Sequence, residues 1–154
     1  MTPILNPFEA ARREMGAWLA YSQNAAAGIE PTLAHLVKIR SSILNGCANC
    51  INMHTREARK DGETEQRLYL LAAWHEAPVF SDRERAALAW TDALTLVAEK
   101  GAPDDAIHAQ LAAHFSEEEQ VKLTLLINVI NGWNRLTVGF HLFASDAELD
   151  AMAA

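Results

Sequence analysis

Apolar residues recur along this chain at intervals of three and four positions, the spacing of one face of a helix. No segment shows the alternation of apolar and polar residues that is typical of a strand. The pattern therefore predicts an all-α fold of about six or seven helices. The expected helices cover residues 7–27, 30–44, 47–60, 63–74, 81–100, 103–114 and 116–143.

Start and stop signals support several of these boundaries. Ser81-x-x-Glu84 and Ser116-x-x-Glu119 are capping boxes, which open helices. Asn45-Gly46 interrupts the apolar pattern and predicts a helix start at the residue that follows. Asn131-Gly132 predicts an irregularity inside the last helix.

The last expected helix is apolar over an unusually wide arc, which two arrangements would explain. It is either a central core helix wrapped by the others or a helix with one face in a subunit contact. Its apolar residues are Val121, Leu125, Leu126, Val129, Ile130, Trp133, Leu136, Phe140 and Phe143.

Length and charge narrow the range of functions. A chain of 154 residues predicts a single domain over residues 1–154, and an apolar fraction of 50% is typical of a folded protein. The 13 basic residues are scattered and outnumbered by 20 acidic residues, so we expect no nucleic-acid partner. No tandem repeat and no low-complexity tract divides the chain.

The location is expected to be cytoplasmic. The first residues contain no cationic segment that leads into an apolar run, so no signal peptide is expected. The most apolar segment, residues 123–143, contains three asparagines, an arginine and a histidine, which argues against a membrane span.

Candidate chemistry is concentrated at Cys47, Cys50 and His54. Spacings of three and four residues place two thiols and an imidazole on one helical face. A disulfide closing so short a loop removes little entropy from the unfolded chain, so a purely structural bridge is not favoured. In a cytosolic chain such cysteines are more typical of catalysis or metal binding.

Three interpretations of this group stay open on the residues alone. A zinc site lacks further ligands in the expected spacing. Alternatively, the cysteines are small buried hydrophobes and the histidine is part of the packing. In dithiol chemistry, one thiolate attacks a peroxide or disulfide and the second resolves the product, with His54 as a base. A position at a helix start favours Cys47 as the more acidic thiol.

Residues 41–59 (SSILNGCANCINMHTREAR) resemble the core of the alkylhydroperoxidase AhpD-like branch of the carboxymuconolactone decarboxylase superfamily. Residues 128–136 (NVINGWNRL) resemble its last-helix segment. The resemblance implies an all-α fold, assembly into trimers or hexamers and a thiol-dependent peroxidase or oxidoreductase that needs no bound cofactor or metal. It also implies a hydroperoxide substrate and an external dithiol or lipoyl-type reductant.

The resemblance further implies a role for each site residue. Cys50 would be the thiol that attacks peroxide, with Cys47 resolving it and exchanging with the reductant. His35 stands twelve residues before Cys47, where the family's proton relay has a glutamate. His35 is therefore a candidate that either replaces the glutamate with a neutral imidazole or only packs.

Two other functions stay open beside the peroxidase. One is a redox sensor or binding module without enzymatic turnover. The other is a decarboxylase of the carboxymuconolactone type, which the C-x-x-C pair argues against. Trp74, His75, Glu76 and Trp90 are candidates for pocket walls, although aromatic residues at helical spacing are often core.

Overall fold

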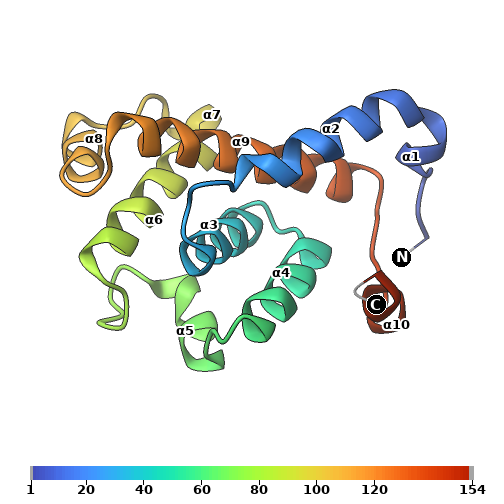
Figure 1. Cartoon of the computed structure of the whole chain (residues 1–154), viewed down its shortest axis with the longest axis horizontal. Helices are drawn as coiled ribbons and strands as arrows, with labels where there is room; N and C mark the ends of the chain where they lie inside the picture. Colours follow the sequence, from blue (N-terminus) through green and yellow to red (C-terminus); the bar gives the residue numbers. More distant parts are fainter. Residues whose placement is uncertain (1, 153–154) are drawn as a thin grey trace.

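The computed structural model describes residues 2–152, which form helices and no strand (Figure 1). The all-α prediction is confirmed, with ten α-helices in this range instead of six or seven. The helices are α1 (Pro7–Ala10), α2 (Arg12–Ala25), α3 (Pro31–Leu44), α4 (Ala48–Lys60), α5 (Glu65–Leu70), the 3₁₀ helix η1 (Leu71–Ala73), α6 (Asp82–Thr95), α7 (Val97–Lys100), α8 (Asp105–Ala112), α9 (Glu117–Gly139) and α10 (Asp146–Met152).

Helix α3 is the central element of the bundle. Pro31 occupies its first turn, where a missing N–H costs no helical hydrogen bond. Leu36, Val37 and Ile39 are each at most 1% exposed, because α3 packs against α4, α6 and α9. In Figure 1, α9 runs across α3 and α4 lies beside it. The helix that follows the cysteine loop is therefore supported by the most buried helix of the fold.

Helix α9 provides a second long support. It begins at the predicted Ser116 capping box and buries Leu123, Leu126 and Ile127 in the core, which favours the core-helix interpretation for this stripe. Other apolar positions stay exposed in this chain, among them Val121. None of the described helices is long and apolar enough to cross a membrane.

The predicted irregularity at Asn131-Gly132 is wrong, since α9 continues through both residues. Gly132 serves close packing instead. A Cβ there would lie 2.6 Å from the ring of Trp18, so the absence of a side chain lets α2 approach α9.

Several other predicted boundaries are wrong. The segment 7–27 divides at Ala11 and the segment 81–100 divides at Leu96, although neither residue is a helix breaker. The segment 63–74 is α-helical only over Glu65–Leu70 and then tightens into η1. The last long helix ends at Gly139 rather than near residue 143.

A helix close to the C-terminus was missed. Ser145 accepts the N–H of Glu148 through Oγ, and the Glu148 carboxylate accepts the N–H of Ser145 at 2.7 Å. These residues form a third Ser-x-x-Glu capping box, ahead of α10. The sequence signal was present, but the short segment has little apolar periodicity.

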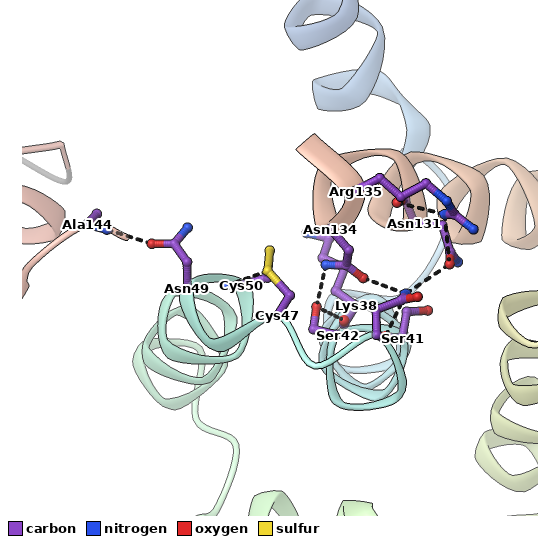
Figure 2. Close-up of a disulfide and its surroundings, with 11 residues drawn as sticks. Lys38, Ser41, Ser42, Cys47, Asn49, Cys50, Asn131, Asn134, Arg135 and Ala144 are labelled. Atoms are coloured by element: carbon purple, nitrogen blue, oxygen red, sulfur yellow. Dashed lines mark hydrogen bonds between the residues drawn. A yellow bond between two sulfur atoms is a disulfide. The ribbon is translucent and has the colours of Figure 1, made fainter. Parts of the chain in front are cut away.

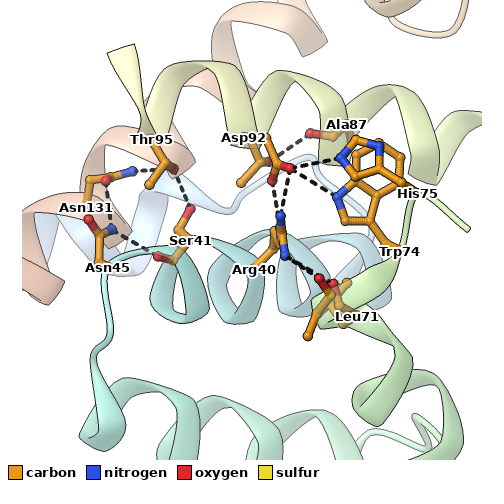
Figure 3. A network of polar contacts seen from close by, with 12 residues as sticks. Arg40, Ser41, Asn45, Leu71, Trp74, His75, Ala87, Asp92, Thr95 and Asn131 are labelled. Atoms are coloured by element: carbon orange, nitrogen blue, oxygen red, sulfur yellow. Dashed lines mark hydrogen bonds and ion pairs between the residues drawn. The ribbon is translucent and has the colours of Figure 1, made fainter. Parts of the chain in front are cut away.

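A buried ion pair joins α3, η1 and α6 (Figure 3). Arg40 Nε and Nη2 donate to the two oxygens of Asp92 at 2.6 and 2.8 Å, and Nη1 donates to the carbonyl of Ala72 at 3.0 Å. Trp74 Nε1 donates to the same carboxylate at 3.2 Å. Because both charges are paired and hydrogen-bonded, the pair can be buried, and it fixes how the three elements meet.

Candidate functional site

A glycine ends α3 and sets the position of the first cysteine. Gly46 adopts a left-handed conformation with φ of 65°. Its N–H donates to the carbonyl of Ile43 at 3.2 Å, and the N–H of Cys47 donates to the carbonyl of Ser42 at 2.9 Å. These two bonds form a Schellman motif, in which glycine is the residue best suited to the left-handed position. The motif delivers Cys47 to the start of α4.

Cys47 is the N-cap of α4, as the break at Asn45-Gly46 predicted. Its Sγ accepts the backbone N–H of Cys50 at 3.3 Å. Free amides and the positive end of the helix dipole favour a thiolate over a thiol at this position. The local backbone therefore favours negative charge on Cys47 in the reduced protein.

The two cysteines form a disulfide, with Cα atoms 5.4 Å apart (Figure 2). Cys47 is 0% exposed and Cys50 is 2% exposed. Figure 2 shows the bridge between Asn49, which reaches toward Ala144, and Asn134 of α9. The pair is thus joined in the fold, and the disulfide is covered by the surrounding residues.

His54 lies one turn after Cys50 on α4 and is buried. Its Nδ1 lies 2.8 Å from Oε2 of Glu57. Burial lowers the pKa of His54, the Glu57 carboxylate acts in the opposite direction, and Lys38 and His35 add to the lowering. The imidazole is therefore neutral at neutral pH and able to accept a proton.

His35 lies on α3 and is also buried, but it contacts a different carboxylate. Its Nε2 lies 2.6 Å from Oδ2 of Asp61, the residue that ends α4. Its Nδ1 is buried and has no hydrogen-bond partner among the described residues. Within that part of the chain, no direct hydrogen bond joins His35 to His54. Its predicted catalytic role stays a prediction.

A network of amide and hydroxyl groups holds the cysteine loop on α9 (Figures 2 and 3). Asn45 Nδ2 lies 3.0 Å from Oδ1 of Asn131 and 2.9 Å from Oδ1 of Asn134. Asn134 Nδ2 in turn donates to Ser42 Oγ at 3.0 Å. These contacts explain why polar residues interrupt the apolar face of α9, since buried amides need partners.

The C-terminal segment is attached to α4. Asn49, which stands between the two cysteines, accepts the N–H of Ala144 through Oδ1 at 2.7 Å (Figure 2). Arg56 of α4 forms an ion pair with Asp150 of α10. The chain beyond α9 is therefore tied to the helix that carries Cys50 and His54.

The carboxymuconolactone decarboxylase family model matches residues 13–93, more than half of the sequence. The chain belongs to this family. The matched range includes all four predicted site residues, and structural similarity identifies the protein as an AhpD-like member.

Relatives of this AhpD-like protein differ in how much is known of them. The uncharacterized protein YdfG of Bacillus subtilis is 49% identical over 110 residues, or 71% of this chain and 74% of that protein. An Agrobacterium tumefaciens protein of unknown function, described as a candidate antioxidant defence protein AhpD, has a TM-score of 0.89 at 43% identity, covering 94% of this chain and 100% of that one. The debrominase Bmp8, solved with 2,3,4-tribromopyrrole, has a TM-score of 0.80 at 18% identity, covering 95% of this chain and 78% of that one. Enzymes therefore occur on this fold.

The described residues contain no group of three or more His, Cys, Asp and Glu side chains arranged to hold a metal ion.

A cavity of about 480 Å³ lies between α6 and the start of α8. Trp74 and His75 line it, whereas the cysteines and His54 do not. Trp90 contacts Thr124 of α9. The aromatic residues thus wall a separate cavity or contribute to packing.

Glu57 and Asp61, the carboxylates that contact the two histidines, are not among the residues predicted from the sequence. Glu57 stands three residues after His54, a spacing that brings helical side chains together, so it could have been found. The pair of His35 and Asp61 joins residues of different helices and has no local signal.

Proposed function

We propose that this AhpD-like protein is a thiol-dependent peroxidase and disulfide oxidoreductase of antioxidant defence. The observation that carries the proposal is a disulfide at the start of α4, one turn before a buried, neutral histidine. Two thiols that can pair and a base beside the second one are what a dithiol peroxidase needs. No bound cofactor is required for this chemistry.

In the first step His54 takes the proton of the Cys50 thiol. The thiolate attacks one oxygen of the hydroperoxide, the O–O bond breaks, and Cys50 becomes a sulfenic acid. The other oxygen leaves as an alkoxide and takes a proton from the histidine, giving an alcohol. His54 suits both proton transfers because it is neutral before the attack.

In the second step the Cys47 thiolate attacks the sulfenic sulfur of Cys50. A disulfide forms and hydroxide leaves as water after taking up a proton. The N-cap position supports this role, since the N–H of Cys50 already points at Cys47 Sγ. A reductant with two thiols then attacks the bridge at Cys47 and leaves oxidised, which restores both protein thiols.

The burial of the bridge bears on the kind of reductant. Cys47 and Cys50 are at most 2% exposed, so a dithiol on a thin, flexible arm fits better than a bulky protein surface. A lipoyl-type dithiol has this shape, and we propose it as the physiological class. The burial of the cysteines likewise favours small hydroperoxides over bulky ones as substrates.

We also propose that the protein acts as a homo-oligomer in the cytoplasm. Apolar side chains that the core leaves uncovered on α9 support the assembly, in line with the subunit contact considered for this helix. Val121 is 59% exposed, Leu125 38% and Val138 47%. The proposed catalytic steps need only residues of one chain.

The test compares Cys50→Ser, Cys47→Ser and the double variant with the unchanged protein, using tert-butyl hydroperoxide and dihydrolipoamide. Cys50→Ser is expected to abolish peroxide consumption, because the attacking thiol is lost. Cys47→Ser, mixed with peroxide in the absence of dihydrolipoamide, is expected to consume one equivalent and to stop at a Cys50 sulfenic acid that dimedone traps. The double variant supplies the background rate. Unchanged peroxide turnover in both single variants would contradict the proposal.

The other functions predict different results. A redox sensor would form the disulfide but show negligible cycling with every reductant. A decarboxylase of the carboxymuconolactone type would turn over its lactone acid equally well after both cysteines are replaced. Either result would replace the peroxidase proposal.

A further inference from the structure

The two thiols, the imidazole and the two carboxylates that contact the histidines follow one another along α4. Cys47, Cys50, His54, Glu57 and Asp61 follow one another at intervals of three, four, three and four residues. Such spacing places them in a stripe along one side of a helix. The stripe runs from the thiols, past the imidazole, to two carboxylates.

The hydrogen bond between His54 and Glu57 assigns the protons of the imidazole. An ionised carboxylate only accepts hydrogen bonds, so His54 Nδ1 carries the hydrogen and donates it to Oε2 at 2.8 Å. In a neutral ring the lone pair then lies on Nε2. None of the described residues donates to or accepts from Nε2. That nitrogen is left as the proton acceptor.

The carboxylate of Glu57 is ionised under these conditions. Burial raises the pKa of Glu57, but the hydrogen bond from His54 outweighs it, together with the positive charge that His54, Lys38 and His35 carry when protonated, and the pKa lies below its ordinary value. His54 is neutral because burial lowers its own pKa. A neutral imidazole and an ionised carboxylate are the states that the Nδ1–Oε2 bond requires.

We propose that Glu57 is the positioning residue of the dithiol site, which holds the His54 ring by Nδ1 and so presents Nε2 to the Cys50 thiol. The inference rests on the proposed function. It places the relay carboxylate on α4, three residues after the histidine, and not at position 35 on α3. Nε2 of His35 contacts Asp61 and not His54.

The experiment measures the reactivity of the Cys50 thiol directly, so that the result does not depend on peroxidase turnover. In a Cys47→Ser background, the alkylation of reduced Cys50 by iodoacetamide is followed from pH 5 to pH 9, with Glu57→Ala, Glu57→Gln and Glu65→Gln compared. Glu57→Ala is expected to slow alkylation at neutral pH by about 100-fold, the lower end of the usual effect of a positioned base. Glu57→Gln keeps an acceptor oxygen and loses only the charge, so its alkylation rate is expected to fall less than that of Glu57→Ala. Glu65 is an exposed carboxylate that pairs with Arg59, and its variant is expected to match the background.

The pH profile separates positioning from structural damage. Since the carboxylate raises the pKa of His54, both Glu57 variants are expected to move the histidine-dependent rise in rate to lower pH. Side-chain ¹⁵N shifts of His54 are expected to show hydrogen on Nδ1 in the background protein and a mixture of tautomers in Glu57→Ala. A Glu57→Ala protein that keeps both the rate and the tautomer overturns the inference. If these results hold but no hydroperoxide is consumed, the peroxidase proposal fails and the role of Glu57 stands.

Discussion

His54 and His35 are both buried histidines paired with a carboxylate of α4, yet the two pairs are built differently. His54 and Glu57 lie on the same helix with a 2.8 Å hydrogen bond, one turn beyond Cys50. His35 reaches from α3 to Asp61 at the end of α4, at 2.6 Å. The first pair does not tie two helices together, because it joins residues already held by one helix, and so it suits the orientation and tuning of an imidazole. The second joins two helices, so it suits a clamp between them.

The largest difference between the two histidine–carboxylate pairs is expected in the rate of Cys50 oxidation. His54→Asn removes the proposed base, and peroxide-dependent oxidation of Cys50 is expected to slow by about 100-fold or more. His35→Asn changes the contact with Asp61 and leaves the proposed base in place, so the rate of Cys50 oxidation is expected to fall much less. Stopped-flow tryptophan fluorescence with excess tert-butyl hydroperoxide measures both rates.

Equal losses in the two variants would contradict this contrast. They would show that His35 transfers or directs a proton itself, as its place in the sequence allows. Both variant proteins must show the helical circular dichroism of the parent, because a loss of folding would slow oxidation for an unrelated reason.

An intermediate effect is expected in the pH dependence of stability, through the lowered pKa of His54. Burial lowers the pKa of His54, so above that folded pKa the unfolded chain binds more protons than the folded protein. Stability should therefore rise with pH through the interval below and around the ordinary histidine pKa of about 6.5 and level off above it. Urea unfolding between pH 5 and pH 8 measures the slope, which His54→Asn is expected to reduce. An unchanged slope would show that His54 is not responsible.

The sequence was sufficient for the parts of the fold that have local signals. The helices 31–44 and 48–60 begin and end close to where Pro31, Asn45-Gly46 and Gly62 indicate, and the capping boxes at Ser81 and Ser116 open helices as expected. The breaks at Ala11 and Leu96 could not be predicted, because they occur at residues that favour a helix. Tertiary packing determines such boundaries, and the local sequence does not contain it.

The candidate site likewise contains residues that the local sequence places and residues that only tertiary packing places. The placement of Cys47, Cys50 and His54 follows from spacing within one helix, and so would the placement of Glu57. His35 contacts a carboxylate 26 positions away, and the side-chain partners of Asn45 on α9 lie 86 and 89 positions away. Contacts over such separations depend on how α3 packs against α4 and α9, which no single-helix pattern reveals.

The smallest effect is expected for the clamp itself. Asp61→Asn keeps a polar group beside His35 Nε2 but removes the charge, and the side chain of Asp61 is 57% exposed. Because solvent screens such a pair, the free energy of unfolding is expected to fall by only about 0.5–1 kcal/mol. Urea denaturation measures it, with Glu65→Gln as a control for an exposed carboxylate on a neighbouring helix. The rate of Cys50 alkylation should not change, since no step proposed here passes through Asp61. If Asp61→Asn instead left stability intact and slowed the thiol as much as Glu57→Ala, both histidine–carboxylate pairs would belong to one proton path.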